Sequence, residues 1–172
     1  MIDTYNDPNG VPYLDTMFAY INENKTNPNA RFVWNMTWAY PDYTDQELYD
    51  TFDRDQVKMY EEIVKGVQQH ILPRTEFARI IPTGTAIQNI RTSYYGEAFN
   101  KDMLHLNELG SVVAGYMTYV ILTDQPLTSI ELTNIRTTVV LTDEDKATIL
   151  EAVNAAFENP YQITQSTHTT RG

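Results

Sequence analysis

Two short apolar runs, separated by a long helical pattern, constrain the fold of this chain most. Residues 31–36 (Arg-Phe-Val-Trp-Asn-Met) and residues 76–81 (Glu-Phe-Ala-Arg-Ile-Ile) are bounded by turn residues, as buried strands usually are. Apolar residues at helical spacing over residues 44–70 lie between them. A strand–helix–strand unit places its two strands in parallel, so the sequence predicts an α/β fold with a parallel sheet flanked by helices.

Further helices are predicted from apolar periodicity and from capping residues. They cover residues 12–24, a short segment from Thr83, a segment following Asn107, and residues 142–158. Thr44 with Glu47, and Thr142 with Asp145, have the spacing of a capping box, and Asn107 is a suitable N-cap. Residues 130–140 are expected to be extended or to form an edge hairpin. Residues 1–172 are expected to form one domain whose tail, residues 160–172, is frayed.

Composition and charge exclude several classes of function. With 172 residues, of which 42% are hydrophobic, the chain can bury a real core. A net charge of -11 argues against nucleic acid and anionic membranes as partners, because both bind cationic surfaces. The chain has no cysteine, no metal-ligand spacing among its three histidines, no glycine-rich phosphate loop and no apolar run of about 20 residues. We therefore expect no metal, no cofactor and no membrane span.

One stretch carries the residues of a catalytic chemistry. Asp102 and His105 are three residues apart, so the carboxylate can meet the imidazole on one turn of backbone. A carboxylate that holds an imidazole in one tautomer prepares it as a general base. The alternative is structural, since Asp102 can instead satisfy backbone amides at the start of a helix.

Residues 101–110 (Lys-Asp-Met-Leu-His-Leu-Asn-Glu-Leu-Gly) resemble the last motif block of the SGNH/GDSL hydrolase superfamily, whose D-x-x-H pair supplies the Asp and His of a serine-hydrolase triad. Residues 31–40, residues 80–91 and the region from Thr142 to Tyr161 are similar to a bacterial branch of that superfamily, mostly described as a domain of unknown function. The resemblance implies part of a three-layer, flavodoxin-like parallel sheet whose N-terminal strands are missing. It assigns the base to His105 and its orientation to Asp102.

The nucleophile block of that superfamily has no counterpart here. The four serines are Ser93, Ser111, Ser129 and Ser166, and none follows Gly-Asp. The resemblance therefore implies the C-terminal part of an ester hydrolase, inactive alone, whose full-length parent is secreted or periplasmic. The alternative is a non-catalytic remnant that binds carbohydrate or protein. Missing strands would leave an exposed sheet edge through which the chain could self-associate.

Aromatic residues near the predicted site indicate a substrate class. Trp38 and Tyr40 follow the first predicted strand, and Tyr94 and Tyr95 lie in the segment before Asp102. Aromatic rings stack on the apolar faces of sugars, so these four side chains are candidate binding residues for a small-molecule or glycan ester. The alternative for Trp38 and Tyr40 is packing against the core.

Overall fold

The structure is a computed structural model that describes residues 13–132 and 137–171. The chain forms two compact units, Met1–Phe32 and Val33–Gly172. In the described part of the first unit, α1 (Tyr13–Asn24) confirms the predicted helix from Tyr13 onward, and the rings of Phe18 and Phe32 meet edge to face with centroids 4.8 Å apart.

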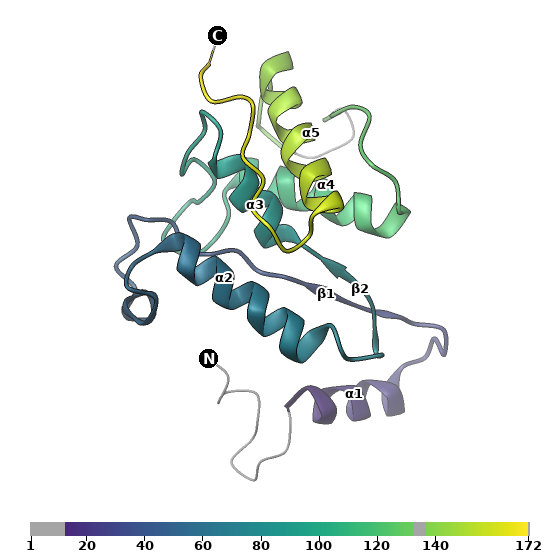
Figure 1. Ribbon diagram of the computed structural model, residues 1–172. Helices are drawn as coiled ribbons and strands as arrows, with labels where there is room; N and C mark the ends of the chain where they lie inside the picture. Colours follow the sequence, from purple (N-terminus) through teal and green to yellow (C-terminus); the bar gives the residue numbers. More distant parts are fainter. Residues whose placement is uncertain (1–12, 133–136, 172) are drawn as a thin grey trace. The chain divides into compact units, whose positions relative to one another are not determined.

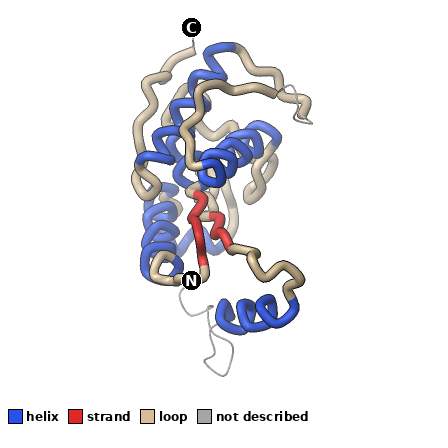
Figure 2. Tube along the Cα trace, turned by 90° about the vertical axis from the view of Figure 1, so that its right-hand side faces the viewer, coloured by secondary structure: helices blue, strands red, loops and turns tan. Residues whose placement is uncertain are grey.

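A small parallel sheet confirms the α/β prediction. It pairs β1 (Phe32–Asn35) with β2 (Phe77–Ile81), and both strands lie within the residues predicted from the sequence. Figure 2 shows the two strands side by side. The described residues thus form a mixed α/β arrangement with a two-stranded sheet, and the larger three-layer sheet stays a prediction.

Three helices build the core beside the sheet (Figure 1). They are α3 (Thr83–Arg91), α4 (Glu108–Thr123) and α5 (Asp143–Glu158), which contact one another, and α4 also contacts β2. All nine residues of α3 are buried, so this short helix runs through the middle of the core rather than along its surface. The apolar side chains between the three helices are fully or almost fully buried, including those of Ile87, Ile90, Val113, Met117 and Val153.

The predicted caps of α4 and α5 are confirmed. The Asn107 side chain accepts a hydrogen bond from the Gly110 N–H, at 2.9 Å. Thr142 and Asp145 form a reciprocal capping box, and α5 ends before Pro160 as expected. No strand occurs in residues 130–132 or 137–140, so of the two alternatives, extended segments or an edge hairpin, the hairpin is not formed in these residues. Residues 133–136 of that prediction lie outside the described residues.

The prediction of one helix over residues 44–70 was wrong. The structure has three successive pieces in place of one helix: a 3₁₀ helix η2 (Glu47–Phe52), α2 (Gln56–Gly66) and a π-helical turn η3 (Val67–Ile71).

The break before α2 has a local cause. Asp53 and Arg54 adopt left-handed backbone conformations, with φ of 56° and 53°, which no continuous helix contains. The Asp55 carboxylate then accepts hydrogen bonds from two N–H groups of the first turn of α2. A carboxylate at this position is a strong N-cap, so Asp55 starts the helix that Thr44 was predicted to start.

Hydrogen bonds join the C-terminal tail to the rest of the chain, and the fraying expected of residues 160–172 stays a prediction. Side chains of α3 and α5, and of Thr92 just after α3, bind backbone and hydroxyl groups of the tail, which have no partner along an isolated extended segment. The hydrogen bonds join Thr164 N–H to Asn89, Ser166 N–H to Thr92, the hydroxyls of Ser166 and Thr167 to Glu151, and Tyr94 N–H to the His168 carbonyl.

Gly84 is expected to be irreplaceable at the junction of β1 and α3. Its N–H donates to the Met36 carbonyl at 3.0 Å, and an added Cβ would lie 2.0 Å from the carbonyl oxygen of Thr37. Backbone must therefore shift, and we expect Gly84→Ala to lower the free energy of unfolding by about 3 kcal/mol, the upper end for overpacked sites.

Gly115 provides the matched control for that substitution. It also lies in a helix, α4, but nothing lies within 4 Å of the position that a Cβ would take there. Gly115→Ala should therefore raise the free energy of unfolding by roughly 0.5–1 kcal/mol. Urea denaturation of the two variants measures both effects, and equal stability of the two would contradict the close approach at Gly84.

Candidate functional site

Asp102 and His105 form the pair that their spacing predicts. The imidazole Nδ1 lies 3.0 Å from Oδ2 and 3.2 Å from Oδ1 of Asp102. Oδ1 also accepts the backbone N–H groups of Leu104, at 2.8 Å, and His105, at 2.6 Å. The His105 side chain is 67% exposed, so its ring remains accessible while one nitrogen is held. Asp102 thus serves both as a loop cap and as the partner of the imidazole.

Three hydrogen bonds keep the Asp102 carboxyl ionised. The N–H of His105, then that of Leu104, then the imidazole lower the pKa of Asp102 to about 2. An ionised carboxylate can only accept hydrogen bonds, so Asp102 favours the tautomer of His105 that carries its hydrogen on Nδ1. This tautomer leaves the Nε2 lone pair available to accept a proton, which is what a general base requires.

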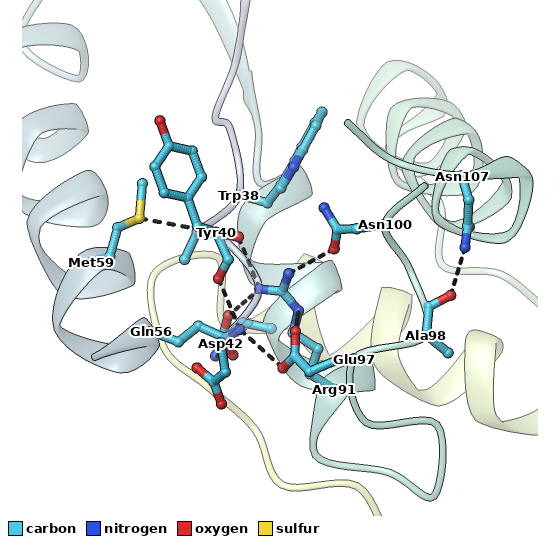
Figure 3. Close-up of polar contacts among 12 residues, drawn as sticks. Trp38, Tyr40, Asp42, Gln56, Met59, Arg91, Glu97, Ala98, Asn100 and Asn107 are labelled. Atoms are coloured by element: carbon cyan, nitrogen blue, oxygen red, sulfur yellow. Dashed lines mark hydrogen bonds and ion pairs between the residues drawn. The ribbon is translucent and has the colours of Figure 1, made fainter. Parts of the chain in front are cut away.

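The loop that carries the pair is closed on itself and fixed to α4. Lys101 N–H donates to the His105 carbonyl at 3.0 Å, and Asn107 N–H donates to the Phe99 carbonyl at 2.9 Å. The Asn107 amide also donates to the Ala98 carbonyl at 2.7 Å (Figure 3). Because Asn107 is also the N-cap of α4, the loop is joined directly to a helix that packs in the core.

Trp38 brings the segment after β1 to this loop. Its indole N–H donates to the Leu104 carbonyl at 3.0 Å, across 66 positions of sequence. Thr44 adds a longer hydrogen bond of 3.4 Å to the Met103 carbonyl. The prediction that the pair lies near Trp38, just beyond the C-terminal end of β1, is therefore confirmed.

Arg91 is the centre of a buried polar network that the sequence did not reveal (Figure 3). Its side chain is 2% exposed and donates to the Ala39 carbonyl at 3.0 Å and to Asn100 Oδ1 at 3.1 Å. Burial lowers the pKa of Arg91, and the Glu97 carboxylate, with its Oε2 at 3.4 Å from Nε, opposes that shift. The network thus joins the end of α3 to both segments of the site.

Gln56 extends the network to α2. Its amide nitrogen donates to the Tyr40 carbonyl at 2.9 Å and to Glu97 Oε1 at 3.0 Å, while its oxygen accepts from Gln88 at 2.9 Å. Tyr40 is therefore held through its backbone, and its ring contacts Tyr49 edge to face at 6.0 Å. The sequence offered one weak signal: residues 83–91 contain a single charged residue, so that helix has no solvated charged face.

Tyr94 and Tyr95 are directed to α5. Their hydroxyls donate to the same oxygen of Asp145, at 2.8 and 2.7 Å, and their rings stack with centroids 4.7 Å apart. Burial and the hydrogen bond to Asp145 raise the pKa of Tyr95; burial opposes ionisation of Asp145, but the hydrogen bonds prevail and lower its pKa. Both hydroxyls are thus engaged at α5, and substrate binding by Tyr94 and Tyr95 stays a prediction.

Metal binding and membrane insertion find no support in the part of the chain that the structure describes. Within it, no group of three or more His, Asp or Glu side chains could hold a metal ion, and no helix is long and apolar enough to cross a membrane. A pocket of ≈ 280 Å³ lies around the start of β2, lined by Leu72, Phe77, Ile121 and Phe157 among others. Neither Asp102 nor His105 lines that pocket, and their side chains are 46% and 67% exposed.

These observations define a class: a mixed α/β protein with an accessible Asp–His pair on a loop beyond the sheet. Comparison with protein families gives the family itself, because residues 7–147 match the domain of unknown function DUF4886. The chain therefore belongs to the DUF4886 family.

A solved structure of the same family is similar to this chain. It is the crystal structure of a DUF4886 family protein from Bacteroides uniformis ATCC 8492, with a TM-score of 0.76 and 28% sequence identity. The match covers 91% of this chain and 59% of that one, so this chain spans less than two thirds of the length of the Bacteroides uniformis protein. No curated protein matches the chain.

The low pKa of Asp102 gives a direct test of the pair's geometry. The folded value, about 2, lies below the 3.8 of an unperturbed carboxyl, so ionisation of Asp102 stabilises the fold above pH 3.8, and this contribution is lost as pH falls through 2. We expect the Asp102 carboxyl carbon to titrate near 2 by NMR in the folded chain and near 3.8 in urea. A folded-state midpoint near 3.8 would contradict the three hydrogen bonds.

Proposed function

We propose that this chain supplies the acid–base pair of a serine ester hydrolase of the SGNH/GDSL type. The main support for this proposal is the accessible ring of His105. Its Nδ1 is held by the Asp102 carboxylate, which backbone N–H groups keep ionised. In a triad of this kind, the carboxylate orients the imidazole and stabilises its protonated form. The resemblance of residues 101–110 to the last motif block of that superfamily supports the proposal.

The proposed reaction is acyl transfer through a covalent intermediate. His105 Nε2 takes the proton from a serine hydroxyl as the serine oxygen attacks the ester carbonyl, and the imidazolium then gives that proton to the departing alcohol. Water, deprotonated by the same imidazole, hydrolyses the acyl-enzyme and restores the serine. Asp102 stays ionised throughout. The substrate class we propose is a carbohydrate ester or another small acyl ester, bound beside Trp38 and Tyr40.

The nucleophile in this proposal comes from outside the chain. Three of the four serine hydroxyls already donate elsewhere: Ser93 to the Ile90 carbonyl, Ser111 to the Asn107 carbonyl and Ser166 to Glu151. No hydrogen bond joins a serine to His105 within the described residues. The nucleophile block is therefore to be sought in the part of the Bacteroides uniformis protein that the match leaves uncovered, together with the strands that would complete a three-layer sheet.

The second candidate is a non-catalytic module that binds carbohydrate or protein. The observation that favours it is the same engagement of the serine hydroxyls, since an imidazole without a nucleophile has nothing to activate.

In either case the two-stranded sheet leaves strand edges unpaired within the described residues, and we propose self-association through such an edge.

A chimera separates the two candidates. The uncovered part of the Bacteroides uniformis protein is joined to this chain, and hydrolysis of aryl acetates and acetylated sugars is measured for the chimera and for the chain alone. The hydrolase proposal expects activity only in the chimera, together with covalent labelling by a fluorophosphonate. A folded chimera that is inert and unlabelled favours the binding module.

A further inference from the structure

The peptide group between Leu104 and His105 is held from both sides. Its carbonyl oxygen accepts the indole N–H of Trp38 at 3.0 Å, and its N–H donates to Asp102 Oδ1 at 2.6 Å. Both contacts act on one rigid planar unit, so a continuous chain of hydrogen bonds runs from Trp38 through the peptide group to Asp102. Hydrogen bonds in such a chain polarise and strengthen one another.

We propose that Trp38 is a positioning residue, which acts through the Leu104–His105 peptide group to hold the Asp102 carboxylate against the imidazole. Rotation of this peptide group would turn its carbonyl oxygen toward the carboxylate and remove a donor from it, which is unfavourable on both counts. Trp38 holds the oxygen in place and thereby opposes the rotation. The catalytic meaning of this inference rests on the proposed function, but the geometry does not.

The loop needs such an external anchor. The side chains of Asp102 and His105 are 46% and 67% exposed, so water competes for the bond between them. The other contacts from the segment after β1 are longer: 3.4 Å from Thr44 to the Met103 carbonyl, and 3.5 Å from Asp45 N–H to the Met103 sulfur. The Trp38 hydrogen bond is therefore the shortest link between the two segments.

The anchor itself is rigidly mounted. Trp38 is half-buried and packs against the core cluster of α3, α4 and α5. The residue before it, Thr37, is pressed against Gly84 at the start of α3, where an added Cβ would lie 2.0 Å from the Thr37 oxygen. The indole thus fixes the exposed loop relative to the core. Its N–H is already used, so only the ring face remains for a substrate.

Trp38→Phe tests the inference, because phenylalanine keeps an aromatic ring but lacks the N–H donor. Trp34→Phe is the matched control: Trp34, the other of the chain's two tryptophans, contacts Phe77 edge to face, with ring centroids 5.5 Å apart. The two indole N–H signals in an NMR spectrum are assigned by their loss in each variant. We expect the Trp38 signal to exchange slowly with solvent and the His105 amide to exchange roughly tenfold faster in Trp38→Phe only.

A second readout is the pKa of the Asp102 carboxyl group. The His105 N–H is the largest cause of the low pKa of Asp102, so Trp38→Phe should raise that pKa from about 2 toward 3.8, whereas Trp34→Phe should not. Unchanged exchange at His105 and an unchanged Asp102 titration in folded Trp38→Phe would overturn the inference. If that variant does not fold, 3-benzothienylalanine at position 38 replaces the N–H with sulfur at nearly constant shape and is read out in the same way.

In the active chimera, positioning and sugar stacking predict different kinetics. Loss of positioning in Trp38→Phe lowers kcat with little change in KM, because the base is misplaced while substrate still binds. A rise in KM alone, with unchanged NMR readouts, would assign Trp38 to substrate binding and overturn the inference. An inert chimera refutes the proposed hydrolase, yet the NMR readouts on the chain itself still decide the role of Trp38.

Discussion

His105→Ala in the chimera is expected to abolish hydrolysis, with a loss on the order of a millionfold in kcat, as when a triad base is removed from well-studied serine proteases. Asp102→Asn should cost less, roughly ten-thousandfold, because the amide keeps the shape but can favour the wrong tautomer of His105. The Asp102 variant also loses the ionised acceptor for the Leu104 and His105 N–H groups, so its loop must be shown to remain ordered.

His168→Ala is the matched control, since His168 lies in the tail and its hydrogen bonds to Tyr94 and Ser166 use only its backbone. Initial rates are compared at equal folded concentration for the chimera and the three variants. Hydrolysis that survives His105→Ala would show that the base lies elsewhere. Equal losses in the His168 and His105 variants would point to a general effect on folding rather than to the pair.

Arg91→Met should lower the free energy of unfolding by about 3 kcal/mol, the lower end of the range for breaking a buried ion pair. The side chain is 2% exposed, and its removal takes the Arg91 hydrogen bonds from the Ala39 carbonyl and from Asn100 Oδ1. It also leaves the Glu97 carboxylate, which still accepts a hydrogen bond from Gln56, without its ion-pair partner. Glu97 is 29% exposed, so water recovers part of its solvation, which is why the lower end applies. Methionine has a similar length and no charge, so the loss reflects the polar network rather than a large cavity.

Arg79→Met provides the control for Arg91→Met. Arg79 pairs with Asp124 at 3.4 Å, but the two side chains are 51% and 61% exposed. Exposed ion pairs contribute about 0–1 kcal/mol, so this variant should unfold at nearly the same urea concentration as the parent chain. If Arg91→Met is as stable as Arg79→Met, the buried network does not hold the site segments together.

The sequence alone determined the local features of this protein. α4 and α5 begin after Asn107 and Thr142 because the side chains of these two residues accept hydrogen bonds from N–H groups three residues further along. The meeting of Asp102 with His105 has the same origin, because three residues of backbone leave little freedom in their separation. The two strands were recognisable because a buried strand is apolar along its length and is bounded by turns.

Only the tertiary structure decided which distant segments meet. Trp38 and Leu104 are 66 positions apart, and Arg91 and Ala39 are 52 apart, so no spacing rule connects them. Asn89, Thr92 and Glu151 bind the tail only because α3 and α5 present them along one path. The error before α2 has the same origin, because the fold uses the Thr44 hydroxyl on the Met103 carbonyl, 59 positions away, and the Asp55 carboxylate caps α2. When a side chain could bond to several partners, the packing of the whole chain decides which one it uses, and the local sequence pattern does not contain that information.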